Sequence, residues 1–134
     1  FRYELDLAEV PESALLHLYA SNLYHLKVNG VMVNMGPLRA FPEAARYDTH
    51  DLRDYLQKGR NVIAMKVLHD GVYNYQMPDM PGGFIAWGQI GGQDLATPGQ
   101  WRCTRTEAYD PNTPKFSFAT GPMEIYDARK DVPY

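Results

Sequence analysis

The sequence predicts an all-β sandwich with one short helical turn. Short segments in which apolar and polar residues alternate recur along the chain, and Gly, Pro and Asn separate them. Only one stretch has the spacing of a helix. The eleven glycines and ten prolines suit the many loops of a sandwich. With 134 residues the chain has the length of one domain with its own core, so we expect a single domain over residues 1–134.

The first two strands follow from period-two patterns. Residues 1–7 place apolar side chains at odd positions and charged ones between them, which indicates a strand with one buried and one solvated face. Pro11 interrupts the pattern, and alternation resumes over residues 14–21. We therefore expect two half-buried strands before the first hairpin.

A β-hairpin is expected around Asn29-Gly30. Alternating residues 24–28 precede this pair, and Val31 and Val33 follow it. Asn-Gly tolerates the positive φ angles of a type I′ turn, whose twist matches that of paired strands. The segment 35–45, which holds one glycine and two prolines, is expected to be a loop.

The helical turn and a central strand come next. Leu52, Tyr55 and Leu56 are spaced to share one helical face, and Gly59 is expected to end the helix after a turn or two in a left-handed cap. Residues 61–69 are apolar at odd and at even positions. This pattern predicts a central strand covered on both sides.

The second half of the chain is less regular. Residues 70–83 are rich in turn formers and aromatics and are expected to form an ordered surface loop, followed by a strand over 83–90 and a Gly91-Gly92 turn. Further short strands are expected over residues 101–108, 115–119 and 123–126. Trp87 and Trp101 fall in strand-like segments, where we expect them to fill the core; stacking on a sugar is the alternative for both rings.

Composition excludes several classes of function. A net charge of −3 with scattered Lys and Arg gives no attraction to nucleic acid or to an acidic membrane, and no apolar run approaches the roughly 20 residues that cross a bilayer. The single Cys103 excludes an internal disulfide and is expected to be a half-buried apolar residue. The chain opens on a strand without an initiator Met, so we expect a fragment of a longer polypeptide.

Five motifs, in order, resemble the N-terminal domain family of bacterial α-L-rhamnosidases. They are YHLKVNGVMV, MGPLR, YDTHDLRDYLQKGRNVIAMKV, GGFIAWGQI with TPGQWRC, and MEIYDARKDVPY. The resemblance implies a jelly-roll, galactose-binding-like sandwich that accompanies a separate (α/α)6 catalytic barrel. It also implies that the partners are the catalytic and other domains of the same polypeptide, and that the enzyme is periplasmic or secreted. No catalytic residue is then expected in this chain.

The resemblance also suggests carbohydrate binding as an alternative function. Some related domains hold a terminal rhamnose with calcium in a loop after the apolar strand, although VYNYQMP differs here from their usual Gly-Trp-Tyr pattern. Tyr73, Asn74 and Tyr75 would supply aromatic faces and hydrogen bonds, and Asp70 a carboxylate for hydroxyls or calcium. Alternatively, the tyrosines pin the loop to the sandwich and Asp70 with Gly71 forms a turn.

A polar group near the C-terminus suggests contacts with a following domain. Paired carboxylates are the acid and base of glycoside hydrolysis, but strand spacing would place Glu124 and Asp127 on opposite faces. We therefore expect Arg129 to pair with one of these acids and to fix the exit toward the next domain, and Arg39 to act as a similar anchor. An independent glycosidase that uses Glu124 and Asp127 is the remaining alternative.

The histidines carry no metal-site signature. Their separation lacks the paired spacing of a zinc site, so ordinary polar strand positions are expected. They are His17, His25, His50 and His69.

Overall fold

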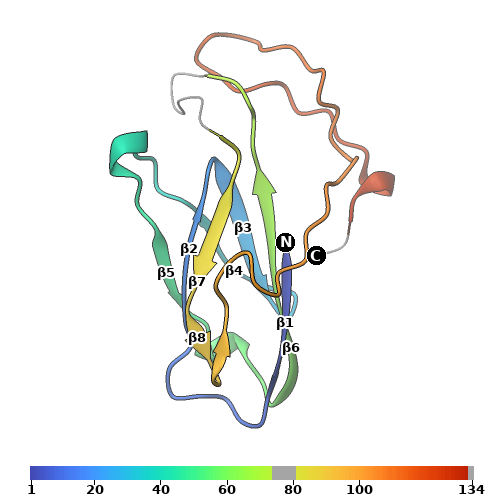
Figure 1. The fold of residues 1–134 in the computed structure, drawn as a ribbon. Helices are drawn as coiled ribbons and strands as arrows, with labels where there is room; N and C mark the ends of the chain where they lie inside the picture. The colour runs from blue at the N-terminus through green and yellow to red at the C-terminus, as the bar shows by residue number, and fades with distance from the viewer. Residues whose placement is uncertain (74–80, 133–134) are drawn as a thin grey trace.

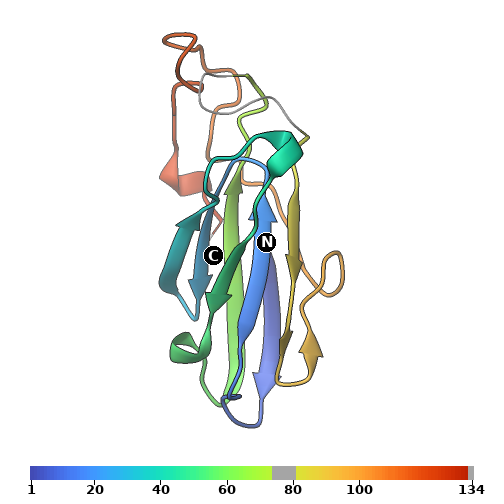
Figure 2. The same cartoon turned by 90° about the vertical axis from the view of Figure 1, so that its left-hand side faces the viewer.

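Two antiparallel sheets form the protein, in agreement with the predicted all-β sandwich. The computed structural model describes residues 1–73 and 81–132. One sheet has the strand order β1-β6-β3-β4, the other β5-β2-β7, and β8 and β9 form a separate small hairpin. In Figures 1 and 2 the strands of both main sheets follow the same long axis. The strands are β1 (Arg2–Leu7), β2 (Leu15–Ala20), β3 (Leu23–Val28), β4 (Val31–Gly36), β5 (Asp48–Asp51), β6 (Gly59–Leu68), β7 (Phe84–Trp87), β8 (Gln89–Ile90) and β9 (Gln93–Asp94).

The core lies between the two main sheets and is made by the predicted alternating positions. On each of the first three strands, every second side chain is buried and its neighbours are more exposed. These core residues are Tyr3, Leu5, Leu7, Leu16, Leu18, Ala20, Tyr24, Leu26 and Val28. The period-two pattern alone therefore identified which face of each strand is apolar and packed.

The predicted hairpin is present. β3 and β4 pair around Asn29 and Gly30, whose φ angles of 50° and 82° are those of a type I′ turn. β4 is an edge strand with mostly exposed side chains, and it continues through Gly36 into the segment expected to be a loop. A 3-10 turn, η1 (Pro42–Ala44), occupies part of the remaining loop.

Two asparagines connect the hairpin to the central strand. The Asn61 side chain is fully buried; its Oδ1 accepts from the Asn29 side chain (2.9 Å) and from the Gln57 backbone (2.8 Å). Its Nδ2 donates to the carbonyls of Gln57 (2.7 Å) and Gly59 (2.8 Å). Asn29 Oδ1 accepts from the Val62 backbone (2.9 Å). The Asn-Gly and Gly-x-Asn motifs are thus parts of one hydrogen-bonded unit.

β6 is the predicted central strand and has β1 and β3 as neighbours. Ile63 and Met65 are buried in the core, and Ala64 is buried on the opposite face. Lys66, also on that face, contacts the C-terminal segment, which explains how the second face is partly covered. Leu68, at the end of the strand, is exposed, so coverage of both faces does not extend along the whole strand.

The predicted helix is shorter than expected. It is a single 3-10 turn, η2 (Arg53–Tyr55), in which no residue is fully buried. Leu52 and Leu56 flank it and are buried, so they act as two anchors of a turn rather than as one helical face. Gly59 has the expected positive φ of 87°, but it begins β6 instead of capping a helix.

The prediction of three strands after residue 100 is wrong. Their place is taken by irregular chain with isolated bridges, namely Arg2 to Arg102, Tyr109 to Tyr126, and Lys115 to Pro122. Proline has no backbone N–H and cannot complete a strand ladder. Pro111, Pro114 and Pro122 therefore limit this region to short pairings. A last 3-10 turn, η3 (Ala128–Lys130), follows.

The two tryptophans differ in environment. Trp101 packs against the core as expected, with its ring centroid 5.4 Å from that of Tyr3 and its Nε1 donating to the Leu95 carbonyl (2.8 Å). For Trp87 the core prediction is wrong, because Ala86 occupies the inner face of β7 and Trp87 points outward with 36% of its surface exposed. Cys103 is exposed rather than half-buried.

Across residues 1–73 and 81–132, no helix has the length and apolarity that a membrane span requires.

Candidate functional site

The predicted sugar-binding loop is described in part. Asp70 is half-buried and Tyr73 is 67% exposed, whereas Asn74 and Tyr75 lie outside the described residues. The Lys115 side chain donates to the Tyr73 carbonyl. The Tyr73 ring is thus accessible and does not pin the loop to the sandwich. Its role in sugar binding stays a prediction.

Both ends of this loop are fastened to the turn between β2 and β3. At one end, His69 Nδ1 lies 2.8 Å from Asn22 Oδ1. At the other, Ser21 and Gly83 exchange hydrogen bonds, with Ser21 N donating to the Gly83 carbonyl (3.0 Å) and Gly83 N to Ser21 Oγ (3.1 Å). His69 therefore follows the strand as a structural residue rather than occupying an ordinary strand position.

Calcium at Asp70 gains no support from the described part of the chain. Within it, no group of three or more His, Cys, Asp and Glu side chains is arranged to hold a metal ion. Calcium takes six to eight oxygen ligands. The described residues around Asp70 do not supply a comparable carboxylate set.

The C-terminal motif contains the predicted ion pair. Arg129 donates from Nε and Nη2 to the two carboxylate oxygens of Asp127, both at 2.8 Å, and this bonding lowers the pKa of that carboxyl. Glu124 is exposed and Arg129 pairs with Asp127 instead. Arg39 is exposed in the segment after β4. Because the pair is local and solvated, it contributes little to stability, and its interdomain role stays a prediction.

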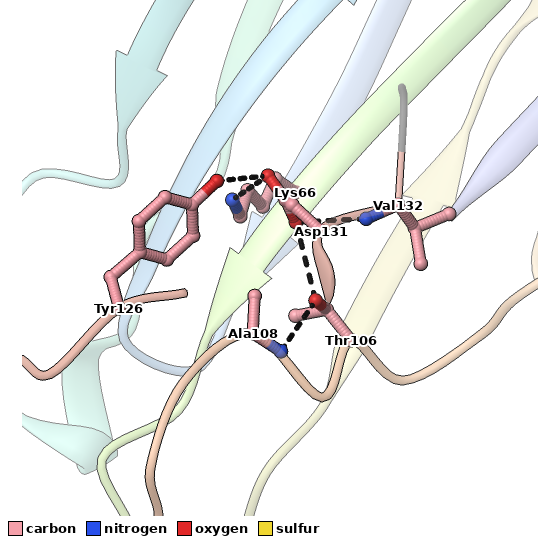
Figure 3. A network of polar contacts seen from close by, with 6 residues as sticks. All are labelled: Lys66, Thr106, Ala108, Tyr126, Asp131 and Val132. Atoms are coloured by element: carbon pink, nitrogen blue, oxygen red, sulfur yellow. Dashed lines mark hydrogen bonds and ion pairs between the residues drawn. The ribbon is translucent and has the colours of Figure 1, made fainter. Parts of the chain in front are cut away.

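A second polar cluster at the C-terminus was not predicted. Asp131 Oδ2 accepts from Tyr126 Oη (2.6 Å) and Lys66 Nζ (3.1 Å), and Oδ1 accepts from Thr106 Oγ1 (3.2 Å) and the Val132 backbone (3.0 Å). Figure 3 shows these groups converging on the Asp131 carboxylate. We call Lys66, Thr106, Tyr126 and Asp131 the C-terminal clamp.

The clamp fixes the C-terminal segment to the four-stranded sheet. Lys66 comes from β6 and the other members from the C-terminal segment, and Lys66 Nζ also lies 4.9 Å from the ring centroid of Tyr109. The hydrogen bond from Tyr126, aided by Lys66, lowers the pKa of Asp131 to about 2. A signal was present in the sequence, because a lysine within the apolar run NVIAMKVL needs a partner when that strand is covered.

A buried polar group links the two sheets. Tyr24, on β3, donates to Asp48 Oδ2 (2.5 Å) and lies 2.9 Å from His50 Nε2; both partners are on β5. Burial raises the pKa of Tyr24 and lowers that of His50. His50 is therefore an inter-sheet contact rather than an ordinary strand residue. The group is enclosed and satisfied, which indicates a structural role.

An irregular hairpin, residues 109–126, precedes the clamp. It is closed by hydrogen bonds from Asp110 N to the Ile125 carbonyl and from Met123 N to the Pro114 carbonyl, both 3.0 Å. We call it the C-terminal hairpin. In Figures 1 and 2 it reaches beyond the ends of the strands. Its tip carries Phe116 and Phe118, which are 86% and 82% exposed.

Known proteins resemble this chain as follows. The family described as the alpha-L-rhamnosidase N-terminal domain matches residues 9–92. The GH78 family rhamnosidase of Bacillus sp. GL1 is 39% identical with a TM-score of 0.85, over 96% of this chain and 14% of that one. The Streptomyces avermitilis alpha-L-rhamnosidase complexed with L-rhamnose is 26% identical with a TM-score of 0.47, over 64% of this chain and 8% of that one. No curated protein matches. The chain thus spans a small part of the solved enzymes that it resembles.

Proposed function

Because this chain belongs to the α-L-rhamnosidase N-terminal domain family, we propose that it is a non-catalytic accessory domain of a longer α-L-rhamnosidase-type glycoside hydrolase. In this proposal residues 1–134 form one domain that packs against the catalytic and other domains of the same polypeptide and shapes access to the active site. Most of the Bacillus enzyme lies outside the region of similarity, which leaves room for such partner domains.

The observation that carries this proposal is the exposed C-terminal hairpin. Single exposed apolar residues are ordinary, but two phenylalanines at one hairpin tip are nearly fully solvated, and Met123 and Ile125 on the returning arm are at least half-exposed. Aromatic residues and Met are enriched at protein interfaces. The clamp holds the base of this hairpin against β6, so its tip would meet a partner in a defined orientation.

The distribution of acids supports the non-catalytic part of the proposal. Glycoside hydrolysis needs two carboxyl groups flanking a bound sugar. A shallow pocket of about 320 Å³ is lined by Phe1, Phe84, Thr97, Pro98, Trp101 and Cys103, which include no acid. Asp127 is held ionised by Arg129, and Glu124 is solvated. Neither carboxyl group lies in the enclosed apolar environment of a catalytic acid.

The family resemblance also underlies a proposed periplasmic or extracellular location for the parent enzyme. The leader sequence of the complete gene tests it. A cytoplasmic location of the full-length protein in fractionated cells would contradict this part of the proposal.

The packing role is tested with the double substitution Phe116→Ser and Phe118→Ser, made both in the 134-residue chain and in the full-length enzyme. Because both side chains are solvated here, the isolated chain should keep its urea midpoint. In the full-length enzyme, loss of the apolar contact should lower the melting temperature and expose the domain boundary to protease.

Val10→Ser provides the control, since Val10 is an exposed apolar residue in the turn between β1 and β2, at the other end of the sandwich. This substitution should change neither the urea midpoint of the 134-residue chain nor the melting temperature of the full-length enzyme. If the double variant and the control have the same melting temperature and protease sensitivity in the full-length enzyme, packing through the C-terminal hairpin is contradicted.

A further inference from the structure

An aromatic cluster lies on the outer face of the three-stranded sheet, away from the core. It consists of His17 on β2, Trp87 on β7 and Tyr47 immediately before β5. The His17 and Trp87 rings are stacked, with centroids 5.4 Å apart and an interplanar angle of 22°. Tyr47 meets Trp87 edge to face at 4.8 Å and His17 at 5.7 Å.

The strands hold this cluster in place. His17 is directly opposite Trp87 in the β2–β7 pair and opposite Thr49 in the β2–β5 pair. His17 Nδ1 lies 2.8 Å from Thr49 Oγ1, which fixes the orientation of the imidazole ring. Two of the three rings are thus on sheet strands rather than on loops, and a ligand would meet a surface that is already ordered.

The cluster is accessible and has hydrogen-bonding capacity to spare. Tyr47 is 57% exposed and Trp87 36%. Neither the Tyr47 hydroxyl nor the Trp87 Nε1 has a hydrogen-bond partner among residues 1–73 and 81–132. Thr49 Oγ1 is on an exposed residue, and a hydroxyl can make further bonds besides the one to His17. Aromatic faces therefore lie beside several polar atoms that point to the same surface.

The charge around the cluster suits a neutral ligand. Asp51, on the same face of β5 as Thr49, is neutralised by Arg53, whose Nε and Nη2 lie 2.8 and 2.7 Å from its Oδ2. The Arg53 guanidinium is thus engaged by Asp51 rather than free to meet a phosphate or an acidic chain. The chemistry on offer is a planar apolar face with neutral donors and acceptors at its edge.

We propose that this aromatic cluster is a binding site for a neutral pyranose ring of a glycan. A pyranose with equatorial hydroxyls presents axial C–H groups on its faces and hydroxyls around its edge. The C–H groups would pack on the Trp87 and Tyr47 rings, and the hydroxyls would bond to the Tyr47 hydroxyl and Thr49 Oγ1. This site uses no residue of the loop at residues 70–83, and it does not depend on the proposed packing function.

The test is a titration of the 134-residue chain followed by amide and indole N–H signals in NMR. The probes are methyl β-D-glucopyranoside and L-rhamnose, with acyclic sorbitol as the control polyol. Concentrations should reach about 100 mM, because a single stacked sugar is expected to bind with a dissociation constant near millimolar. Saturable shifts of the Trp87 indole signal with either pyranose, and not with sorbitol, are expected, while the Trp101 signal stays in place.

Three variants locate the site. Trp87→Ala and Tyr47→Ala should each weaken binding about tenfold or more. Tyr47 lies outside the strands, so its variant tests the site even if loss of Trp87 disturbs β7. Tyr73→Ala, in the other candidate loop, should leave the affinity unchanged.

The proposal is overturned if neither pyranose gives a saturable shift. It is equally overturned if sorbitol gives the same shifts as the sugars, or if both cluster variants bind as the unmodified chain does. Loss of binding in Tyr73→Ala alone would move the sugar site to the loop.

Discussion

Replacing Asn61 by alanine should destabilise this fold strongly, although the substitution removes only a few atoms. The side chain is fully buried and makes four hydrogen bonds, to the side chain of Asn29, to the N–H and carbonyl of Gln57, and to the carbonyl of Gly59. At about 1 kcal/mol net for each bond, the loss is about 3 to 4 kcal/mol. This is a large part of the 5–15 kcal/mol typical of a domain.

The assay is equilibrium urea unfolding of the 134-residue chain, followed by tryptophan fluorescence. Asn112→Ala is the matched control, because Asn112 is exposed and, within the described part of the chain, only its backbone N–H is bonded, to Asp110. It should change the free energy of unfolding by less than about 0.5 kcal/mol. Asn29→Gly keeps the positive φ of the turn but removes the amide that bonds to Asn61. The double variant should therefore lose less stability than the sum of the two single variants. An Asn61→Ala effect as small as that of the control would refute the reasoning.

Three further results are expected. Gly36→Ala should lower the free energy of unfolding by about 1 to 3 kcal/mol, since the new Cβ would lie 2.5 Å from Asp48 Oδ2. Gly83→Ala is the control in the same urea unfolding assay and should have little effect, because the space around Gly83 is open. The pKa of the Asp131 carboxyl is lowered from 3.8 to about 2, so this group should contribute stability above about pH 4 that is lost as the pH falls toward 2. Asp131→Asn should remove this pH dependence. A carboxyl carbon NMR signal of Asp131 that titrates near 3.8 would argue against the clamp. Burial lowers the pKa of His50 below its ordinary 6.5, so the unfolded chain takes up this proton first and stability should decline as the pH falls below 6.5; an NMR titration that places His50 at or above 6.5 would show this to be wrong.

The first part of the fold was accessible to sequence reasoning because its signals are local. Period-two alternation identifies one strand at a time, and Asn29-Gly30 specifies a turn through backbone conformation alone. The apolar run of β6 likewise predicted a central position in the sheet. Each of these predictions needed only a few neighbouring residues.

The C-terminal third was less predictable because its structure depends on distant partners. The segment after residue 100 has strand-like composition, yet it is held by one lysine on β6 and by isolated bridges instead of a continuous ladder. Trp87 illustrates the same limit, since the register of β7 decides which of two neighbouring residues faces the core. Ala86 occupies that position, and hydrophobicity alone would have chosen the tryptophan.

The candidate sites show a similar division. The Asp127–Arg129 pair is local and could be predicted, whereas the clamp joins residues 66 and 131 and the aromatic cluster joins residues 17, 47 and 87. Such groups form only when strands far apart in the sequence become neighbours. A single sequence contains their residue types but not their proximity.

The packing role is tested most directly by hydroxyl-radical footprinting of the 134-residue chain beside the full-length enzyme. Phe116 and Phe118 should be oxidised readily in the isolated chain, in keeping with their exposure, and several-fold more slowly in the full-length enzyme. Val10, in the turn between β1 and β2, should react alike in both. Equal oxidation of the two phenylalanines in both proteins would contradict a domain that packs through its C-terminal hairpin.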